Sequence, residues 1–255
     1  MFAFLGRALA RYLQKELPGY RPISESSVEK IRSVLRPGDI LLVEGNHRIS
    51  AAIKYTTQST WSHAAFYAGV SSEGEGADDD PLCLIEADVL EGVVMVPLSK
   101  YGHLSTRICR PVGLSAEDLE RLILYMKGRI GDKYDIRNVF DLMRYMLPEP
   151  PVPMHWRRRM LALGSGDPTR AICSTLIAQG FQSIRYPILP EIQRVLSEKD
   201  SGSETGTATM KEILHIRHHS LYAPRDFDIS PYFEIVKPTL ELGFDYKTLN
   251  WSEQG

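Results

Sequence analysis

Three side chains in the sequence have the types that thiol-dependent hydrolysis needs: Cys173, His63 and Glu86. A cysteine attacks a carbonyl as its thiolate. Because a free thiol has a pKa of about 8.5, it needs a helix N-terminus or a neighbouring imidazolium to ionise near neutral pH. A histidine can accept the thiol proton, and a carboxylate on its second ring nitrogen orients the ring and stabilises the imidazolium. These residue types predict a nucleophile, a general base and an orienting group.

Cys173 opens a run over 174–182 in which apolar residues recur at helical spacing. The free N–H groups of the first helical turn and the helix dipole would then point at its sulfur. The same N–H groups can hold an oxyanion, so Ser174 is a candidate for oxyanion binding. Considered alone, Cys173 also fits a small buried apolar residue. Cys83 and Cys109 lie inside apolar β-prone runs and are predicted to belong to the core.

His63, Ala65 and Tyr67 share one face of a β-prone run. Glu86 lies in the next such run among apolar residues, where a carboxylate without a partner would be costly to bury. Adjacent strands would bring His63 and Glu86 within reach, whereas Cys173 must be delivered by packing its helix against the sheet. Singly, His63 fits a structural histidine and Glu86 an edge-strand surface residue. The order of strand histidine, next-strand acid and helix-start cysteine favours the triad.

Strands and helices at several places in the chain must position these side chains. β-prone runs lie at 39–44, 62–68, 82–87, 92–96 and 106–109. Helical patterns lie near 28–35, 49–55, 115–128 and 136–147 and from residue 173 onward. Together they predict an α+β fold, with an antiparallel sheet or small barrel packed against the cysteine-bearing helix and extra helices at the N-terminus.

The N-terminal segment is predicted to be an amphipathic helix that ends at Pro18 and Gly19. Basic residues interrupt it too early for a signal-peptide core. We expect this helix to dock on its own domain. The alternative is peripheral membrane contact through residues 1–16, to which the basic run 155–160 would contribute.

The composition limits the possible partners and ligands. The chain has 255 residues, of which 43% are hydrophobic and 24% charged, and a net charge of −2, so nothing indicates nucleic acid as a partner. Three cysteines without a close pair argue against a disulfide framework and a zinc site and favour a reducing compartment, so we expect a cytoplasmic protein. His215, His218 and His219 lack a carboxylate or cysteine to complete a metal site. No metal and no cofactor is predicted.

Several segments together resemble the permuted papain-like amidases of the YaeF/YiiX group, within the NlpC-type superfamily. They are residues 36–42, 61–67, 84–87 with Gly92, and 172–177, and residues 222–231 also look like the closing segment of the family. In unpermuted relatives the cysteine helix precedes the histidine strand, whereas here it follows, as in permuted members. The resemblance implies a circularly permuted papain-like catalytic domain at 36–238, after an N-terminal helical extension at 1–35 and before a C-terminal tail at 239–255.

The resemblance also implies residue roles. Cys173 becomes the nucleophile, His63 the general base and acid, and Glu86 the orienting group. For substrate or oxyanion binding, the candidates are Ser174, Tyr67 and Tyr134, the last within a segment that resembles a family loop near the site. The chain departs from the family at Thr175, where many members have an acidic residue.

The implied reaction is attack of a thiolate on an amide, ester or thioester carbonyl to form a thioacyl-enzyme. We expect an amidase or peptidase that hydrolyses an amide-linked peptide or a lipidated amide. One alternative is a lipid-linked acyltransferase or deacylase that uses the same thiol on an acyl lipid. A further alternative is a catalytically inactive binding module on the same fold.

Overall fold

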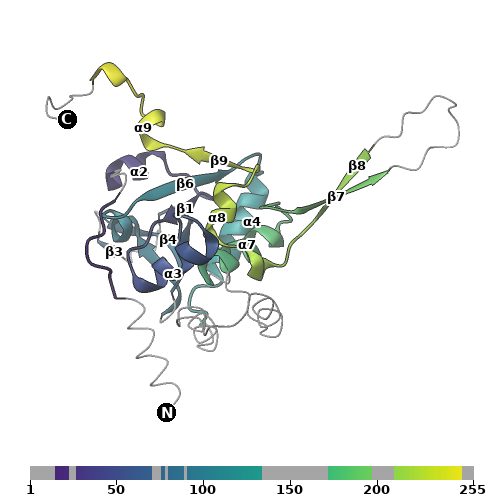
Figure 1. The fold of residues 1–255 in the computed structure, drawn as a ribbon, viewed down its shortest axis with the longest axis horizontal. Coiled ribbons are helices and arrows are strands. Elements are labelled where there is room, and N and C mark those ends of the chain that lie inside the picture. The colour runs from purple at the N-terminus through teal and green to yellow at the C-terminus, as the bar shows by residue number, and fades with distance from the viewer. Residues whose placement is uncertain are drawn as a thin grey trace, which may run out of the picture.

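The computed structural model describes residues 15–22, 27–70, 76–77, 80–88, 91–133, 172–196 and 210–248 (Figure 1). Several predictions fall outside these ranges: the helix near 136–147, the basic run 155–160, Tyr134, and residues 1–14 of the predicted N-terminal helix. The described end of that predicted helix is not helical, because Glu16 forms an isolated antiparallel β-bridge with His47. The described residues contain the predicted thiol, imidazole and carboxylate.

An antiparallel sheet forms the centre of the molecule (Figure 1). Its strands are β1 (Ile40–Val43), β2 (His63–Tyr67), β3 (Gly76–Ala77), β4 (Asp80–Asp88), β5 (Gly92–Pro97), β6 (Thr106–Pro111) and β9 (Phe233–Val236). The strand order is β3-β4-β2-β1-β6-β9, and β5 pairs with β4. All five predicted β-prone runs form strands, and β9 joins the sheet from far along the chain.

Helices surround this sheet. They are α2 (Val28–Val34), α3 (Arg48–Thr57), α4 (Ala116–Lys127), α7 (Ile172–Ser183), α8 (Pro224–Asp228) and α9 (Pro238–Glu241), with 3₁₀ turns η1 (Leu98–Tyr101), η2 (His219–Leu221) and η3 (Tyr246–Thr248). Ser27 and Ser115 cap α2 and α4 by accepting backbone N–H groups of the first turn. The described helices include none that is both long and apolar enough to span a membrane. The predicted α+β fold is confirmed.

The sheet separates two hydrophobic clusters. On one side α4 and α7 cover Ala64, Phe66 and Ile85, and on the other α2 and η1 cover alternate residues such as Ala65 and Leu84. This alternation follows from the two-residue period of a strand. The cysteine-bearing helix α7 packs on β2 and β4, the strands that carry the predicted histidine and acid.

A two-stranded ribbon that the sequence did not predict extends from this body (Figure 1). It consists of β7 (Glu191–Leu196) and β8 (Met210–His215), which pair antiparallel with each other. The ribbon leaves the body between α7 and η2, so it is an addition to the sheet and not part of it.

Gly92 begins β5, the partner strand of the one that carries Glu86, and the chain there passes very close to the turn after α4. Gly92 has a φ of +86°, and a Cβ on it would lie 2.2 Å from the carbonyl oxygen of Asp132. The adjacent Val93 N–H donates to that same oxygen at 2.8 Å. A side chain at position 92 would therefore break the contact that fixes β5.

We expect Gly92→Ala to lower the free energy of unfolding by about 3 kcal/mol, because a left-handed conformation costs roughly 1–2 kcal/mol and overpacking roughly 1–3 kcal/mol. The matched control is Gly113→Ala, since Gly113 has a φ of +72° but a Cβ on it would have nothing within 4 Å. That variant should lose only about 1 kcal/mol. Urea unfolding followed by circular dichroism measures both, and equal losses would contradict the steric argument.

Candidate active site

Cys173 is the second residue of α7 and its side chain is almost fully buried, with 5% exposed. Strands β2 and β4 pair at Phe66–Ile85 and Tyr67–Leu84. Nearer the start of β2, the backbone N–H of Ala64 donates to the Cys173 sulfur. The start of α7 thus places the thiol beside the first residues of β2.

His63 is the first residue of β2 and pairs with Val43 of β1. Its Nε2 lies 3.0 Å from Oε2 of Glu86, in the neighbouring strand β4. Nδ1 is then left for the hydrogen bond between the imidazole and the Cys173 side chain. The structure therefore brings the three predicted residues together in the order thiol, imidazole, carboxylate.

The electrostatics of the first two groups favour a charged pair. Burial alone would lower the pKa of His63, but the charges of Cys173 and Glu86, with the hydrogen bonds to both, raise it to about 10. Burial alone would raise the pKa of the Cys173 thiol. The charge and hydrogen bond of His63, with the backbone N–H groups of Ala64 and Ser174, lower that pKa instead. The arrangement favours a thiolate beside an imidazolium.

Glu86 is 1% exposed, and in the described part of the chain it has two partners besides His63. Lys100 Nζ donates to its Oε1, and the Tyr101 hydroxyl donates to its Oε2. The Tyr101 ring also lies 5.8 Å from the His63 ring, centroid to centroid. Burial would raise the pKa of Glu86, but the charges and hydrogen bonds of His63 and Lys100 lower it, which keeps the carboxylate ionised.

Lys100 and Tyr101 are site residues that the sequence did not predict. They lie in η1, directly after β5, the strand that pairs with β4. The sequence contains one clue to their role. A buried acid needs hydrogen-bond donors, and a lysine and a tyrosine directly follow the strand that pairs with the strand of Glu86. The sequence did not show that η1 folds back over Glu86.

The remaining predicted site residues lie in different surroundings. Ser174 is fully buried, its hydroxyl donates to the Tyr222 carbonyl at 2.8 Å, and its backbone N–H donates to the Cys173 sulfur. Tyr67 lies four residues from His63, at the other end of β2, in the cluster that contains Cys83 and Leu84. The structure therefore places the Tyr67 side chain in the core and does not bring it to Cys173. Tyr134 is outside the described residues.

The other two cysteines are buried in the hydrophobic clusters. Burial raises the pKa of Cys83 to about 11 and also raises the pKa of Cys109, so both favour the neutral thiol. Among the described residues, no group of three or more His, Cys, Asp or Glu side chains could hold a metal ion. The rings of His218 and His219 lie against each other at an angle of 35°, with centroids 4.1 Å apart.

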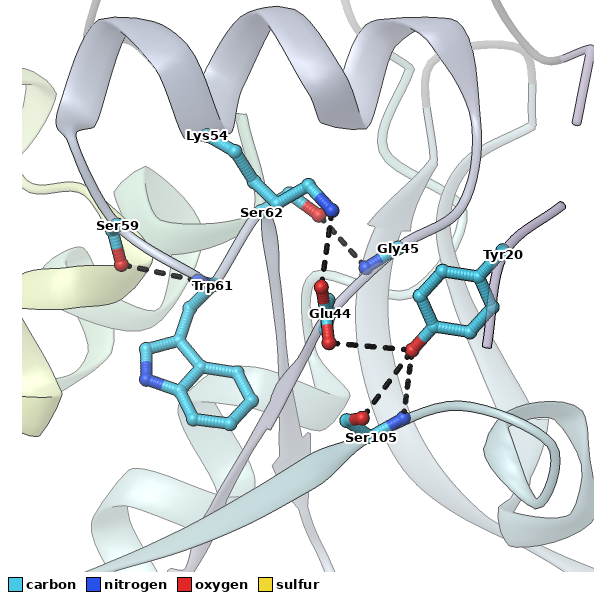
Figure 2. Close-up of polar contacts among 8 residues, drawn as sticks. All are labelled: Tyr20, Glu44, Gly45, Lys54, Ser59, Trp61, Ser62 and Ser105. Atoms are coloured by element: carbon cyan, nitrogen blue, oxygen red, sulfur yellow. Dashed lines mark hydrogen bonds and ion pairs between the residues drawn. The ribbon is translucent and has the colours of Figure 1, made fainter. Parts of the chain in front are cut away.

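The loop that leads into His63 is fixed by hydrogen bonds, several of which Figure 2 shows. Ser62 Oγ accepts the Gly45 N–H at 3.0 Å, and Ser59 Oγ accepts the Trp61 N–H at 3.0 Å. The Trp61 indole N–H donates to Asp228 in α8 at 2.9 Å. These contacts hold the residues just before His63 to α8 and to the end of β1.

A second polar cluster, Tyr20–Glu44–Lys54–Ser105, lies beside this loop (Figure 2). The Tyr20 hydroxyl donates to Glu44 at 3.4 Å or Ser105 Oγ at 3.3 Å and accepts the Ser105 N–H at 3.1 Å. Lys54 of α3 pairs with the other Glu44 oxygen at 3.2 Å. The cluster therefore joins Tyr20, which precedes α2, to Glu44, directly after β1, and to Ser105, directly before β6.

Comparison with known proteins agrees with the resemblance inferred from the sequence. The model of the permuted papain-like amidase family YaeF/YiiX matches residues 34–145, which include His63 and Glu86 but not Cys173. Among solved structures, the chain is similar to the metalloprotein YiiX from Escherichia coli O157:H7. The identity is 19% and the TM-score 0.45, over 79% of this chain and 96% of that one. No curated protein matches the chain.

The family match confirms the predicted resemblance to permuted papain-like amidases. That family is a class of cysteine hydrolase. In this chain the thiol-bearing helix α7 follows β2 and β4 and lies outside the matched residues.

We expect Tyr20→Phe to lower the free energy of unfolding by about 1–2 kcal/mol, because it removes the hydroxyl that links Glu44 and Ser105. Tyr246→Phe is the matched control, since the Tyr246 side chain is 65% exposed and the same change there should have almost no effect. Thermal and urea unfolding measure both variants. A Tyr20→Phe variant as stable as the control would show that the cluster does not secure residue 20.

Proposed function

We propose that this chain is a thiol-dependent amidase or peptidase. In this proposal Cys173 is the nucleophile, His63 the general base and acid, and Glu86 the orienting group. One observation carries it: His63 is hydrogen-bonded to Cys173 on one side and lies 3.0 Å from the buried Glu86 carboxylate on the other. An imidazole held between a thiol and a carboxylate is the arrangement that nucleophilic catalysis by cysteine requires.

In the first half of the reaction, the Cys173 thiolate attacks the amide carbonyl carbon and forms a tetrahedral intermediate. The first N–H groups of an α-helix have no carbonyl partner within the helix, so those at the start of α7 can donate to the oxygen that becomes negative. His63, already protonated, gives its proton to the leaving nitrogen as the C–N bond breaks. The products are a free amine and a thioacyl-enzyme.

In the second half, neutral His63 removes a proton from a water molecule, which attacks the thioester carbonyl. The C–S bond breaks, the carboxylic acid leaves, and Cys173 returns to the thiolate form beside the protonated imidazole. Glu86 remains ionised throughout and accepts the His63 Nε2–H, so that Nδ1 faces the sulfur.

For the substrate, we propose an amide-linked peptide or a lipidated amide. Both supply an acyl group and an amine that leaves, which is all that the thiol and imidazole require. The experiments below separate peptide from lipid donors and also test whether the thiol is reactive at all.

We expect iodoacetamide to label Cys173 at least about 100-fold faster than Cys83 or Cys109 at about pH 6, because the pKa of Cys173 is lowered whereas burial raises the pKa of the other two thiols. Peptide mass spectrometry after timed labelling gives the three rates separately. His63→Ala should remove the difference. Equal rates in the unchanged protein would instead favour a binding module without catalytic activity.

We expect Cys173→Ser to reduce amide hydrolysis by about 10³-fold or more without loss of the fold, since a serine hydroxyl is a far weaker nucleophile in a site built for a thiolate. His63→Ala should lose nearly as much activity, and Glu86→Gln less, because Glu86 orients the ring and makes no bond to the substrate. The matched control is Cys83→Ser, which changes a buried thiol outside the site and should retain turnover.

Intact mass measurement after incubation with peptide fragments, or with liposomes, detects acylated Cys173 directly. Acylation by peptide or N-acyl amide supports the proposal. Acylation by liposomes alone would replace it with a lipid acyltransferase or deacylase, and full hydrolysis by Cys173→Ser would place the nucleophile elsewhere.

A further inference from the structure

The groups at the site form a row of alternating charge. Cys173 is bonded to His63, His63 to Oε2 of Glu86, and Glu86 through Oε1 to Lys100. When the thiol and imidazole form an ion pair, the signs along this row are negative, positive, negative and positive. The row begins at the nearly buried thiol, passes through the buried carboxylate and ends at Lys100, whose side chain is 42% exposed.

The net charge of the row affects the pH at which the buried Cys173 loses its proton beside the protonated His63. Many cysteine triads use a neutral asparagine as the third group, which leaves the thiolate and imidazolium in balance. Here the third group is Glu86, which adds a negative charge where water is largely excluded. A buried charge without a partner is unfavourable, so a carboxylate in this position needs a cation of its own.

We propose that Lys100 is a positioning residue that supplies this cation, and that its charge, acting through Glu86, lowers the pH at which Cys173 becomes a thiolate beside the protonated His63. This inference rests on the proposed function of Cys173 and His63. Lys100 touches neither of those two groups in the row. It holds Oε1 of Glu86, while Tyr101 and His63 share Oε2.

The other titratable groups described near Glu86 do not replace Lys100. Tyr101, in the same 3₁₀ turn, donates a neutral hydroxyl. The pKa of His47, in the loop before α3, is lowered, and burial is the largest cause. The charge of Glu16 raises this pKa, whereas the charges of three nearby groups lower it further: Lys100, His103 and His63. The lowered pKa favours the neutral imidazole of His47. Among the described residues, Lys100 is the lysine that contacts the carboxylate.

Four variants test the charge balance by the pH at which Cys173 becomes half thiolate. This midpoint is measured as the rate of Cys173 alkylation by iodoacetamide from acid to neutral pH, with circular dichroism at each pH as a check of the fold. The variants are Lys100→Met, Glu86→Gln, the double change, and Lys100→Arg, which keeps the positive charge.

Lys100→Met leaves the Glu86 charge uncompensated, which disfavours a second negative charge at Cys173. The midpoint should move to higher pH by roughly 0.5 to 1 unit, less than the 1–3 units of a directly contacting charge. Glu86→Gln removes the negative charge and leaves Lys100, so the midpoint should move to lower pH. The double variant restores the balance and should return close to the unchanged protein, as should Lys100→Arg.

Lys54→Met is the matched control. Lys54 also pairs with a largely buried glutamate, Glu44, but in the polar cluster of Figure 2 and not in the row that contains His63. This variant should lose stability without a shift of the midpoint. If loss of structure were the cause, Lys100→Met and Lys54→Met would both lower the labelling of Cys173. Shifts of the midpoint in opposite directions for Lys100→Met and Glu86→Gln require an effect of charge.

Two results would overturn the inference, and they can be told apart. If Cys173 is highly reactive in the unchanged protein but Lys100→Met and Glu86→Gln shift the midpoint in the same direction or not at all, the role of Lys100 is wrong and the proposed function stands. If Cys173 in the unchanged protein reacts no faster than Cys83, both proposals fail.

Discussion

The buried carboxylate of Glu86 is the constraint on which the rest of the site depends. It is 1% exposed, so its charge must be met by protein donors and not by water. His63, Lys100 and Tyr101 provide those donors from two different elements, β2 and η1. The Glu86 carboxylate thereby orients the imidazole ring of His63 and joins β2 to the turn η1. Together with Lys100, it also sets the electrostatic potential at Cys173.

The sheet explains how a helix can deliver a thiol to this pair. β1 and β4 flank β2, and their pairing fixes the position of His63. At the start of β2, the backbone N–H of Ala64 donates a hydrogen bond to the Cys173 sulfur. Ser174 then fastens the start of α7 to Tyr222 through its hydroxyl, so the thiol is held from the sheet and from the segment before α8.

Chain order matters little to this chemistry. The helix that bears the thiol follows the strands in the sequence, yet the three side chains meet because α7 packs on β2 and β4. The model of the permuted papain-like amidase family matches residues 34–145, which carry the histidine and the acid but not the thiol. Catalysis depends on which groups meet and in what charge state, and packing of the core determines both.

The sequence by itself determined the local elements and the types of the reacting groups. Alternating and helical patterns predicted five of the strands and the helices α2, α3, α4 and α7, because those patterns reflect contacts between near neighbours. The residue types of Cys173, His63 and Glu86 indicated thiol chemistry. Only the tertiary structure decided that η1 folds back to bring Lys100 and Tyr101 to Glu86, that β9 joins the sheet, and that Tyr67 lies in the core. Those outcomes depend on contacts between residues distant in the chain, for which a single sequence carries no periodic pattern.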